Sequence, residues 1–147
     1  MASTIRELMT TNCVTATLND NVYELAVLMK QFDIGFIPIV DDKKLIGVVT
    51  DRDLVVRGYA DKKPGSTAVK EVMTKHLETI SPDATVEEAA KKMAANQIRR
   101  LPVVDNDKLV GVIAIGDLAV QQSLKQGAIN ALSGISEHEH REPPVVH

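Results

Sequence analysis

The apolar positions of the chain follow a pattern that occurs twice. Each time, a stretch with the spacing of an amphipathic helix precedes two short apolar runs separated by a polar turn. The first set spans residues 22–50 and the second spans residues 86–114. We therefore predict two copies of one unit that contains both helix and strand. The helical spacing rests on Val22, Leu25, Ala26 and Met29, and again on Val86, Ala89, Ala90 and Met93.

The two copies align when the chain is shifted by 64 positions. Residues 5–56 then lie over residues 69–120 without a gap, and 19 of the 52 aligned positions are identical. A similarity of this length at a fixed offset indicates an internal duplication, which determines the architecture before any local assignment.

Both predicted helices begin with the same pattern of polar residues. Asn21 is followed three positions later by Glu24, and Thr85 is followed by Glu88. This spacing is typical of a capping box, in which each side chain accepts a hydrogen bond from the other residue's backbone N–H. We expect helices to start directly after Asn21 and Thr85.

The paired apolar runs predict a β-hairpin in each copy. A second helix is expected to start at Asp51 or Gly116, and a short helix to precede each copy. The resulting fold class is α/β (α+β), with two β-α-β-β-α units related by a pseudo-twofold and packed sheet to sheet so that their apolar faces are covered. We divide the chain into residues 1–64, residues 65–126 and a tail at 127–147.

Composition narrows the function. Apolar residues make up 44% and charged residues 25%, which is typical of a globular protein. A net charge of -3 and an aromatic content of 3% argue against nucleic acid as a partner. The single Cys13 excludes an intramolecular disulfide, and neither a signal-peptide pattern nor an apolar run of about eighteen residues is present. We expect a cytoplasmic protein without a membrane partner.

The sequence contains no motif for catalysis. It lacks a nucleophile motif, a phosphate-binding glycine loop, a metalloprotease helix and a pair of catalytic carboxylates, so we expect no enzyme activity and no metal. His138 and His140 could bind a transition metal weakly, but a solvated tail is the simpler interpretation.

Thr50 and Asp53 are the strongest candidates for binding chemistry. Thr50 ends a predicted strand, and Asp53 lies in the first turn of the next helix, where free N–H groups favour an anionic ligand. The carboxylate can accept two hydrogen bonds from a ribose diol, and the hydroxyl can donate to a phosphate oxygen. The same pair also fits a simple helix cap. In the second copy Asp117 is retained, but Ala114 replaces the hydroxyl.

The duplicated pattern resembles tandem cystathionine-β-synthase (CBS) domains, the Bateman module. The resemblance covers about residues 3–125 and rests on the hydrophobic-Pro-hydrophobic-Val-Asp runs and on Gly47-Val48-Val49-Thr50-Asp51-Arg52-Asp53 with its counterpart, residues 111–117. It implies a sensor of an adenosine-containing ligand with two clefts. In the first cleft Asp53 and Thr50 would face Thr79, Ile80, Ile98, Arg99 and Arg100, with Arg52 as a weaker phosphate ligand. In the second cleft Asp117 would face Thr15, Ala16, Gly35 and Phe36.

Within this resemblance the two copies differ where a ligand would be held. Arg99 and Arg100 stand where the first copy has Gly35 and Phe36, and two adjacent arginines there would reach ligand phosphates, while the backbone near Ile80 and Ile98 would contact the adenine edge. An exposed arginine pair with surface acids is the alternative. We expect one strong site at Asp53 and one weak site at Asp117.

Two functions remain open at this stage. The first is a regulatory module that binds AMP, ADP, ATP or a related adenosyl compound and signals to an unidentified effector protein by a conformational change. The second is a structural dimerisation or partner-docking module with vestigial clefts. A helix-mediated homodimer is expected in either case, because the second helices are rich in apolar residues. These are Leu54, Val55, Leu118, Ala119 and Val120.

Overall fold

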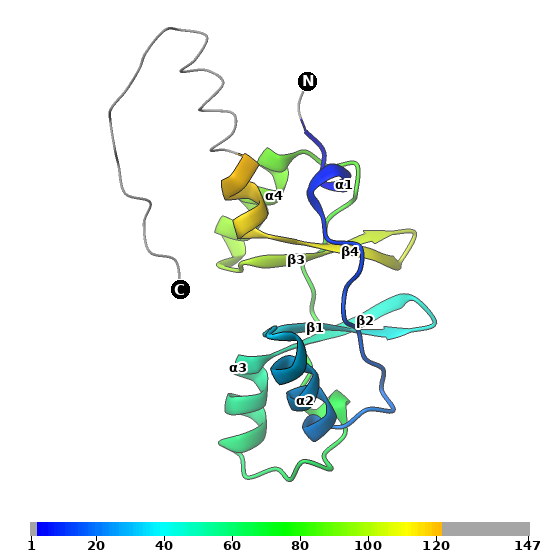
Figure 1. Cartoon of the computed structure of the whole chain (residues 1–147), viewed down its shortest axis with the longest axis vertical. Coiled ribbons are helices and arrows are strands. Elements are labelled where there is room, and N and C mark those ends of the chain that lie inside the picture. Colours follow the sequence, from blue (N-terminus) through cyan, green and yellow to red (C-terminus); the bar gives the residue numbers. More distant parts are fainter. Residues whose placement is uncertain (1–2, 122–147) are drawn as a thin grey trace, which may run out of the picture.

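The computed structural model describes residues 3–121, and each half contains the same helices and strands in the same order (Figure 1). The elements of the first half are α2 (Val22–Phe32), β1 (Phe36–Asp41), β2 (Lys44–Thr50), α3 (Asp51–Asp53) and the π-helical turn η1 (Leu54–Tyr59), which continues α3. The elements of the second half are α4 (Val86–Asn96), β3 (Arg100–Asp105), β4 (Lys108–Ala114) and a helix over residues 115–121. The predicted hairpin and flanking helices are confirmed in both copies.

Reciprocal hydrogen bonds fix the start of both long helices. The Glu24 N–H donates to Asn21 Oδ1 at 2.9 Å, and the Asn21 N–H donates to Glu24 Oε1 at 3.1 Å. The Glu88 N–H donates to Thr85 Oγ1 at 3.2 Å, and the Thr85 N–H donates to Glu88 Oε2 at 3.4 Å. Both predicted capping boxes are therefore confirmed, and each satisfies two donors that the first helical turn leaves without partners.

The core-facing side of the long helices is narrower than the spacing predicts. Leu25 and Met29 are buried, but Ala26 is exposed, and in the second copy Ala90 is exposed as well. Residue 26 lies about 100° around the helix from Leu25, so its side chain points away from the strands. The half-buried Leu28 packs against the core in its place.

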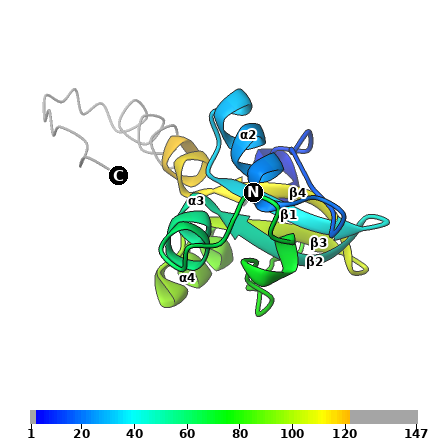
Figure 2. The same cartoon turned by 90° about the horizontal axis from the view of Figure 1, so that it is seen from below.

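The two hairpins lie one against the other, as Figures 1 and 2 show from two directions. They join near their turns, where Lys44 pairs with Lys108 in a single antiparallel register position. The Leu45 N–H donates to Asp107 O at 3.2 Å, and the Leu109 N–H donates to Lys43 O at 2.8 Å. The strand order is therefore β1-β2-β4-β3 in a four-stranded antiparallel arrangement, which confirms the predicted α+β class of two facing hairpin units.

The first strand of each predicted unit is reduced to one parallel bridge. Ala16 pairs with Ile39 in the first half, and Ile80 pairs with Val103 in the second. Each of these bridging residues makes two backbone hydrogen bonds to its hairpin. For example, the Ile80 N–H donates to Pro102 O at 3.1 Å. Each copy therefore contributes two full strands to the four-stranded sheet, whereas the predicted β-α-β-β-α unit has three strands.

The short helices that precede the two copies are exchanged between the halves. Ile5 on α1 (Ile5–Leu8) is fully buried in the core of the second half, beside Leu101. Val69 on the 3₁₀ turn η2 (Val69–Glu71) is fully buried in the core of the first half. We place the division of the chain between residues 64 and 65. Each core is therefore completed by a segment that lies in the other part of the sequence.

The second helices expose only part of their apolar surface. Leu118, which we expect on the surface, is buried in the second core, and Leu54 is half-buried against the first core. These two residues occupy the same position in the repeat and point toward their own hairpins. Val55, Ala119 and Val120 are exposed.

Candidate functional site

A cleft of about 870 Å³ lies between the two halves. The first half contributes the end of β2 and α3, the second half contributes the end of α4 and the start of β3, and the connecting segment over residues 74–78 forms a third wall. Its volume is in the range of about 300–1,000 Å³ that is usual for small-molecule sites. The lining residues are Gly35, Phe36, Val48, Thr50, Asp51, Arg52, Asp53, Thr74, His76, Leu77, Glu78, Asn96, Gln97, Ile98, Arg99, Arg100 and Pro102.

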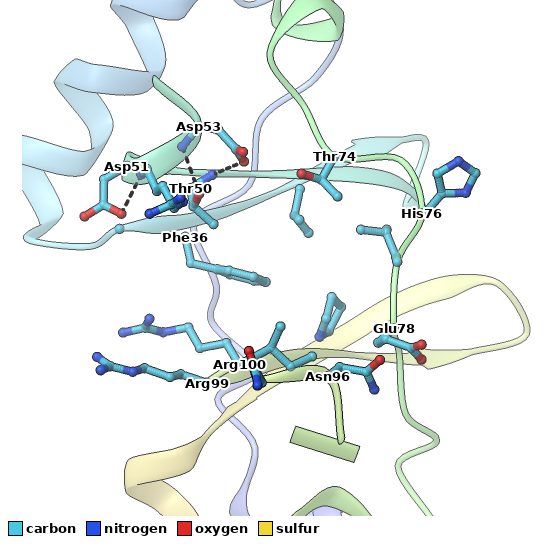
Figure 3. A pocket seen from close by; sticks show the side chains of 17 residues that line it. Phe36, Thr50, Asp51, Asp53, Thr74, His76, Glu78, Asn96, Arg99 and Arg100 are labelled. Atoms are coloured by element: carbon cyan, nitrogen blue, oxygen red, sulfur yellow. Dashed lines mark hydrogen bonds between the residues drawn. The ribbon is translucent and has the colours of Figure 1, made fainter. Parts of the chain in front are cut away.

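Thr50 and Asp53 form a third capping box, and it opens onto this cleft (Figure 3). The Asp53 N–H donates to Thr50 Oγ1 at 3.1 Å, and the Thr50 N–H donates to Asp53 Oδ2 at 2.9 Å. The Thr50 hydroxyl keeps its proton as a free donor, and the carboxylate keeps lone pairs that a ligand can use. Capping and ligand binding are therefore compatible roles for this pair.

Positive charge lies on the opposite wall of the cleft. Arg100 is the first residue of β3 and Arg99 directly precedes it, and Figure 3 shows both across from Thr50 and Asp53. Both arginines are exposed, and Phe36 lies in the space between the two walls. A ligand with a diol at one end and an anionic group at the other would meet a carboxylate on one half and guanidinium groups on the other.

A second cleft of about 360 Å³ lies around Asp117. The Ala114 N–H donates to Asp117 Oδ2 at 2.9 Å, which repeats the arrangement of Thr50 and Asp53 without a hydroxyl. Burial raises the pKa of the Cys13 thiol, which lines this cleft, so the thiolate is disfavoured. The lining residues are Thr10, Asn12, Cys13, Val14, Phe32, Asp33, Ile34, Phe36, Pro38, Arg100, Val112, Ala114 and Asp117.

Comparison with known sequences identifies the repeated unit. The profile of the CBS domain matches residues 5–58 and again residues 69–121. The chain belongs to the CBS-domain family. The CBS pair is 45% identical over 145 residues to the protein YlbB of Bacillus subtilis, and the match covers 97% of this chain and 98% of YlbB.

Two solved structures resemble the CBS pair over most of its length. The putative acetoin utilization protein AcuB from Vibrio cholerae has a TM-score of 0.76 and 28% identity, covering 93% of this chain and 100% of AcuB. The CBS domain pair of protein MJ0100, in complex with 5′-methylthioadenosine and S-adenosyl-L-methionine, also has a TM-score of 0.76 and 28% identity, covering 85% of this chain and 99% of the other. A relative with the same architecture therefore binds adenosine-containing compounds.

Most of the residues expected in the first cleft of the CBS pair are brought together there. Thr50, Arg52 and Asp53 face Ile98, Arg99 and Arg100 across it. Thr79 and Ile80 instead line an adjacent groove of about 820 Å³. Ile80 cannot face the first cleft because its backbone pairs with Val103 and its side chain is buried in the second core.

The residues expected opposite Asp117 are distributed differently. Phe36 lines both clefts, and Gly35 lines the first cleft, where a Cβ would lie 2.8 Å from Asp51 Oδ2 and would require that carboxylate to move. Thr15 and Ala16 line neither cleft, because Ala16 is buried in the first core and its N–H donates to Pro38 O.

Sequence reasoning overlooked the segments just before the bridging residues. In the first cleft these are His76, Leu77 and Glu78, and in the second they are Asn12, Cys13 and Val14. The two segments correspond to each other at the 64-residue offset. The repeat could have marked them as equivalent, but not as walls of the clefts.

The described part of the CBS pair shows two further features. Within residues 3–121, no group of three or more His, Cys, Asp or Glu side chains is arranged to hold a metal ion. No helix in that range is long and apolar enough to cross a membrane. His138 and His140, with the rest of the predicted tail at 127–147, lie outside the described residues.

Proposed function

We propose that the protein is a regulatory module that binds an adenosine-containing ligand in the cleft at Asp53. A separate effector protein would respond to the conformation of the ligand-bound module. One observation carries the proposal: the complete Thr50–Asp53 capping box faces Arg99 and Arg100 across a cleft that both halves of the chain form. The adenosine compounds bound to the related CBS pair of MJ0100 support the same ligand class. No catalytic step is assigned to the chain.

Each wall has a distinct role in the proposed complex. The Asp53 carboxylate accepts hydrogen bonds from the ribose hydroxyls, and the Thr50 hydroxyl donates to the group on the 5′ carbon. Arg99 and Arg100 bind a phosphate or carboxylate there, and Arg52 assists. The backbone around Ile98 contacts the adenine edge. AMP, ADP, ATP and S-adenosylmethionine all fit this chemistry.

The ligand would act as a bridge between the two halves. The first half holds the ribose, and the arginines of the second half bind the ligand's anionic group together with Thr50 and Arg52. Binding therefore favours the relative position that satisfies both walls. The change in conformational equilibrium equals the difference in the ligand's affinity for the two positions and cannot exceed it. The effector would recognise the favoured position.

The two clefts would also affect each other, because Phe36 and Arg100 line both of them. Arg100 can direct its guanidinium toward an anionic group in one cleft or the other. The second cleft is smaller and has the methyl group of Ala114 in place of a hydroxyl, so it is the weaker site. An anionic ligand in the first cleft therefore lowers the affinity of the second.

Calorimetry with AMP, ADP, ATP, 5′-methylthioadenosine and S-adenosylmethionine tests the proposal. We expect at least one of them to bind with saturation at one strong site per chain. GTP serves as a control for the base, because its purine edge presents different donors and acceptors. If no adenosine compound binds, or if GTP binds equally well, the proposed function is wrong and the structural docking module becomes the better interpretation.

We also propose that the protein forms a homodimer through the exposed apolar surface of its second helices. Val55, Tyr59 and Val120 are 59%, 84% and 62% exposed, and a dimer through these helices would cover them. We expect a dimer in sedimentation experiments and a monomer for Tyr59→Glu. Leu18→Glu is the matched control, because Leu18 is also exposed but lies in a loop. A monomeric wild type, or equal dissociation by both substitutions, would refute this interface.

A further inference from the structure

Arg57 lies beside the proposed ribose ligand Asp53. Its Nε is 3.9 Å from Asp53 Oδ1, one helical turn earlier, and its Nη1 donates to Met73 O at 3.1 Å. The guanidinium therefore contacts Asp53, which lines the first cleft, and Met73, the residue just before the wall at 74–78, without lining the cleft itself.

The position of Arg57 restricts the orientation of the Asp53 carboxylate. Asp53 Oδ2 already accepts the Thr50 N–H, and Arg57, which is not among the residues that line the cleft, attracts Oδ1. The Asp53 side chain is only 13% exposed, so water competes weakly for it. With one oxygen hydrogen-bonded and the other attracted by the guanidinium, the carboxylate favours one orientation of its remaining lone pairs, which lowers the entropy lost when a diol binds.

The second contact of Arg57 connects Asp53 to the segment that crosses between the halves. Met73 packs against β2 so closely that a Cβ at Gly47 would lie 2.7 Å from its Sδ. The next residue, Thr74, exchanges backbone hydrogen bonds of 2.8 and 3.1 Å with Val48 and lines the cleft. Arg57 thus links the ribose-binding carboxylate to the start of the wall at residues 74–78.

The second copy lacks this arrangement. At the 64-residue offset Arg57 is replaced by Gln121, whose Nε2 donates to Ser3 Oγ at 3.0 Å. The cation beside the carboxylate therefore occurs in the same copy as the Thr50 hydroxyl, next to the cleft that both Arg99 and Arg100 line. The Thr50 hydroxyl, the Arg99–Arg100 pair and Arg57 thus distinguish the two copies, and all three would strengthen ligand binding in the first cleft. Of these residues, only Arg57 does not line that cleft.

From these contacts we infer that Arg57 is a positioning residue for the adenosyl site: it holds Asp53 in the orientation that binds the ribose diol. The inference rests on the proposed function and adds a residue that determines recognition of the sugar. Because Arg57 acts through Asp53, its loss weakens ligands that carry the 2′-hydroxyl more than ligands without it.

Calorimetry on Arg57→Gln, which introduces the residue of the second copy, tests this inference. The probe is whichever of AMP, ADP, ATP, 5′-methylthioadenosine and S-adenosylmethionine binds the wild type most tightly, together with its 2′-deoxy counterpart. We expect Arg57→Gln to weaken the ribose compound about two- to fivefold, in keeping with a partly exposed ion pair, and to affect the 2′-deoxy compound much less. Arg57→Lys, which keeps the charge, should recover part of the loss.

Lys63→Gln is the matched control. Lys63 Nζ donates to Glu71 O at 3.4 Å, so it is a cation bound to a backbone carbonyl near Met73 but without contact to Asp53. Circular dichroism confirms that each variant is folded at the titration temperature. The inference is wrong, while the proposed function stands, in either of two cases. In the first, Arg57→Gln binds the ribose probe as tightly as the wild type does. In the second, its affinity falls equally for the ribose probe and for the 2′-deoxy compound. If no probe binds the wild type, both are wrong.

Discussion

Asp53→Ala is expected to weaken the binding of the adenosyl ligand by about a hundredfold. The substitution removes a carboxylate that would accept two hydrogen bonds from the ribose, and each bond to a charged group contributes on the order of 1.5–3 kcal/mol. Because the side chain is only 13% exposed, water cannot replace it fully in the empty space. Isothermal calorimetry measures the loss directly.

Asp117→Ala is the matched control for this substitution. Asp117 accepts a backbone N–H from Ala114 as Asp53 does from Thr50, so both variants lose one equivalent capping bond. Each is expected to lose roughly 1 kcal/mol of stability from that cap. Only Asp53→Ala should weaken binding at the strong site. Equal losses of affinity in the two variants would show that the first copy has no special role. Unchanged binding by Asp53→Ala would show that Asp53 does not contact the ribose.

The duplication and the local elements were predictable from the sequence because they depend on nearby residues. A capping box needs only two residues three positions apart, and the boxes at Asn21 and Thr85 are observed as expected. The hairpins follow from short apolar runs on either side of a polar turn. In each case the signal and the structure that it specifies lie within the same short segment of the chain.

The partners of each core were not predictable in this way. The pattern marks Ile5 and Val69 as apolar residues at the start of each copy, but it does not show which hairpin they cover. In the structure each packs on the half to which its own copy does not belong. This choice depends on the path of the chain between the halves, which has no counterpart in the local spacing of apolar residues.

Part of the candidate site was also predictable from the sequence, and part of it was not. Thr50, Asp53, Arg99 and Arg100 were predictable because the motif and the difference between the copies identify them, and they lie in one cleft. The wall at residues 76–78 was not, because it becomes a wall only when the two halves meet. Pairing of Ile80 with Val103 turns the Ile80 side chain into the core, while residues 76–78, which precede Thr79, line the cleft.

Ile5→Ala is expected to destabilise the second half of the molecule by about 2–4 kcal/mol, although Ile5 belongs to the first copy in the sequence. The side chain is fully buried in the core with Leu101 and Ile113, and α1 is attached there by the Ile5 N–H, which donates to Ala84 O at 3.0 Å. Removal of three buried carbons leaves a cavity that the neighbouring strands cannot close. Urea unfolding monitored by circular dichroism measures the loss.

Hydrogen exchange locates the effect, because the exchanged helices make opposite predictions for the two halves. Ile5→Ala should speed exchange at amides of β3 and β4, whereas Val69→Ala, its counterpart in the other core, should speed exchange in β1 and β2. Glu7→Ala, an exposed position on α1, is the control and should change stability by less than about 0.5 kcal/mol. Faster exchange of β1 and β2 in Ile5→Ala would place α1 on its own copy. The sequence division between residues 64 and 65 would then also be the physical one, and each half would complete its own core.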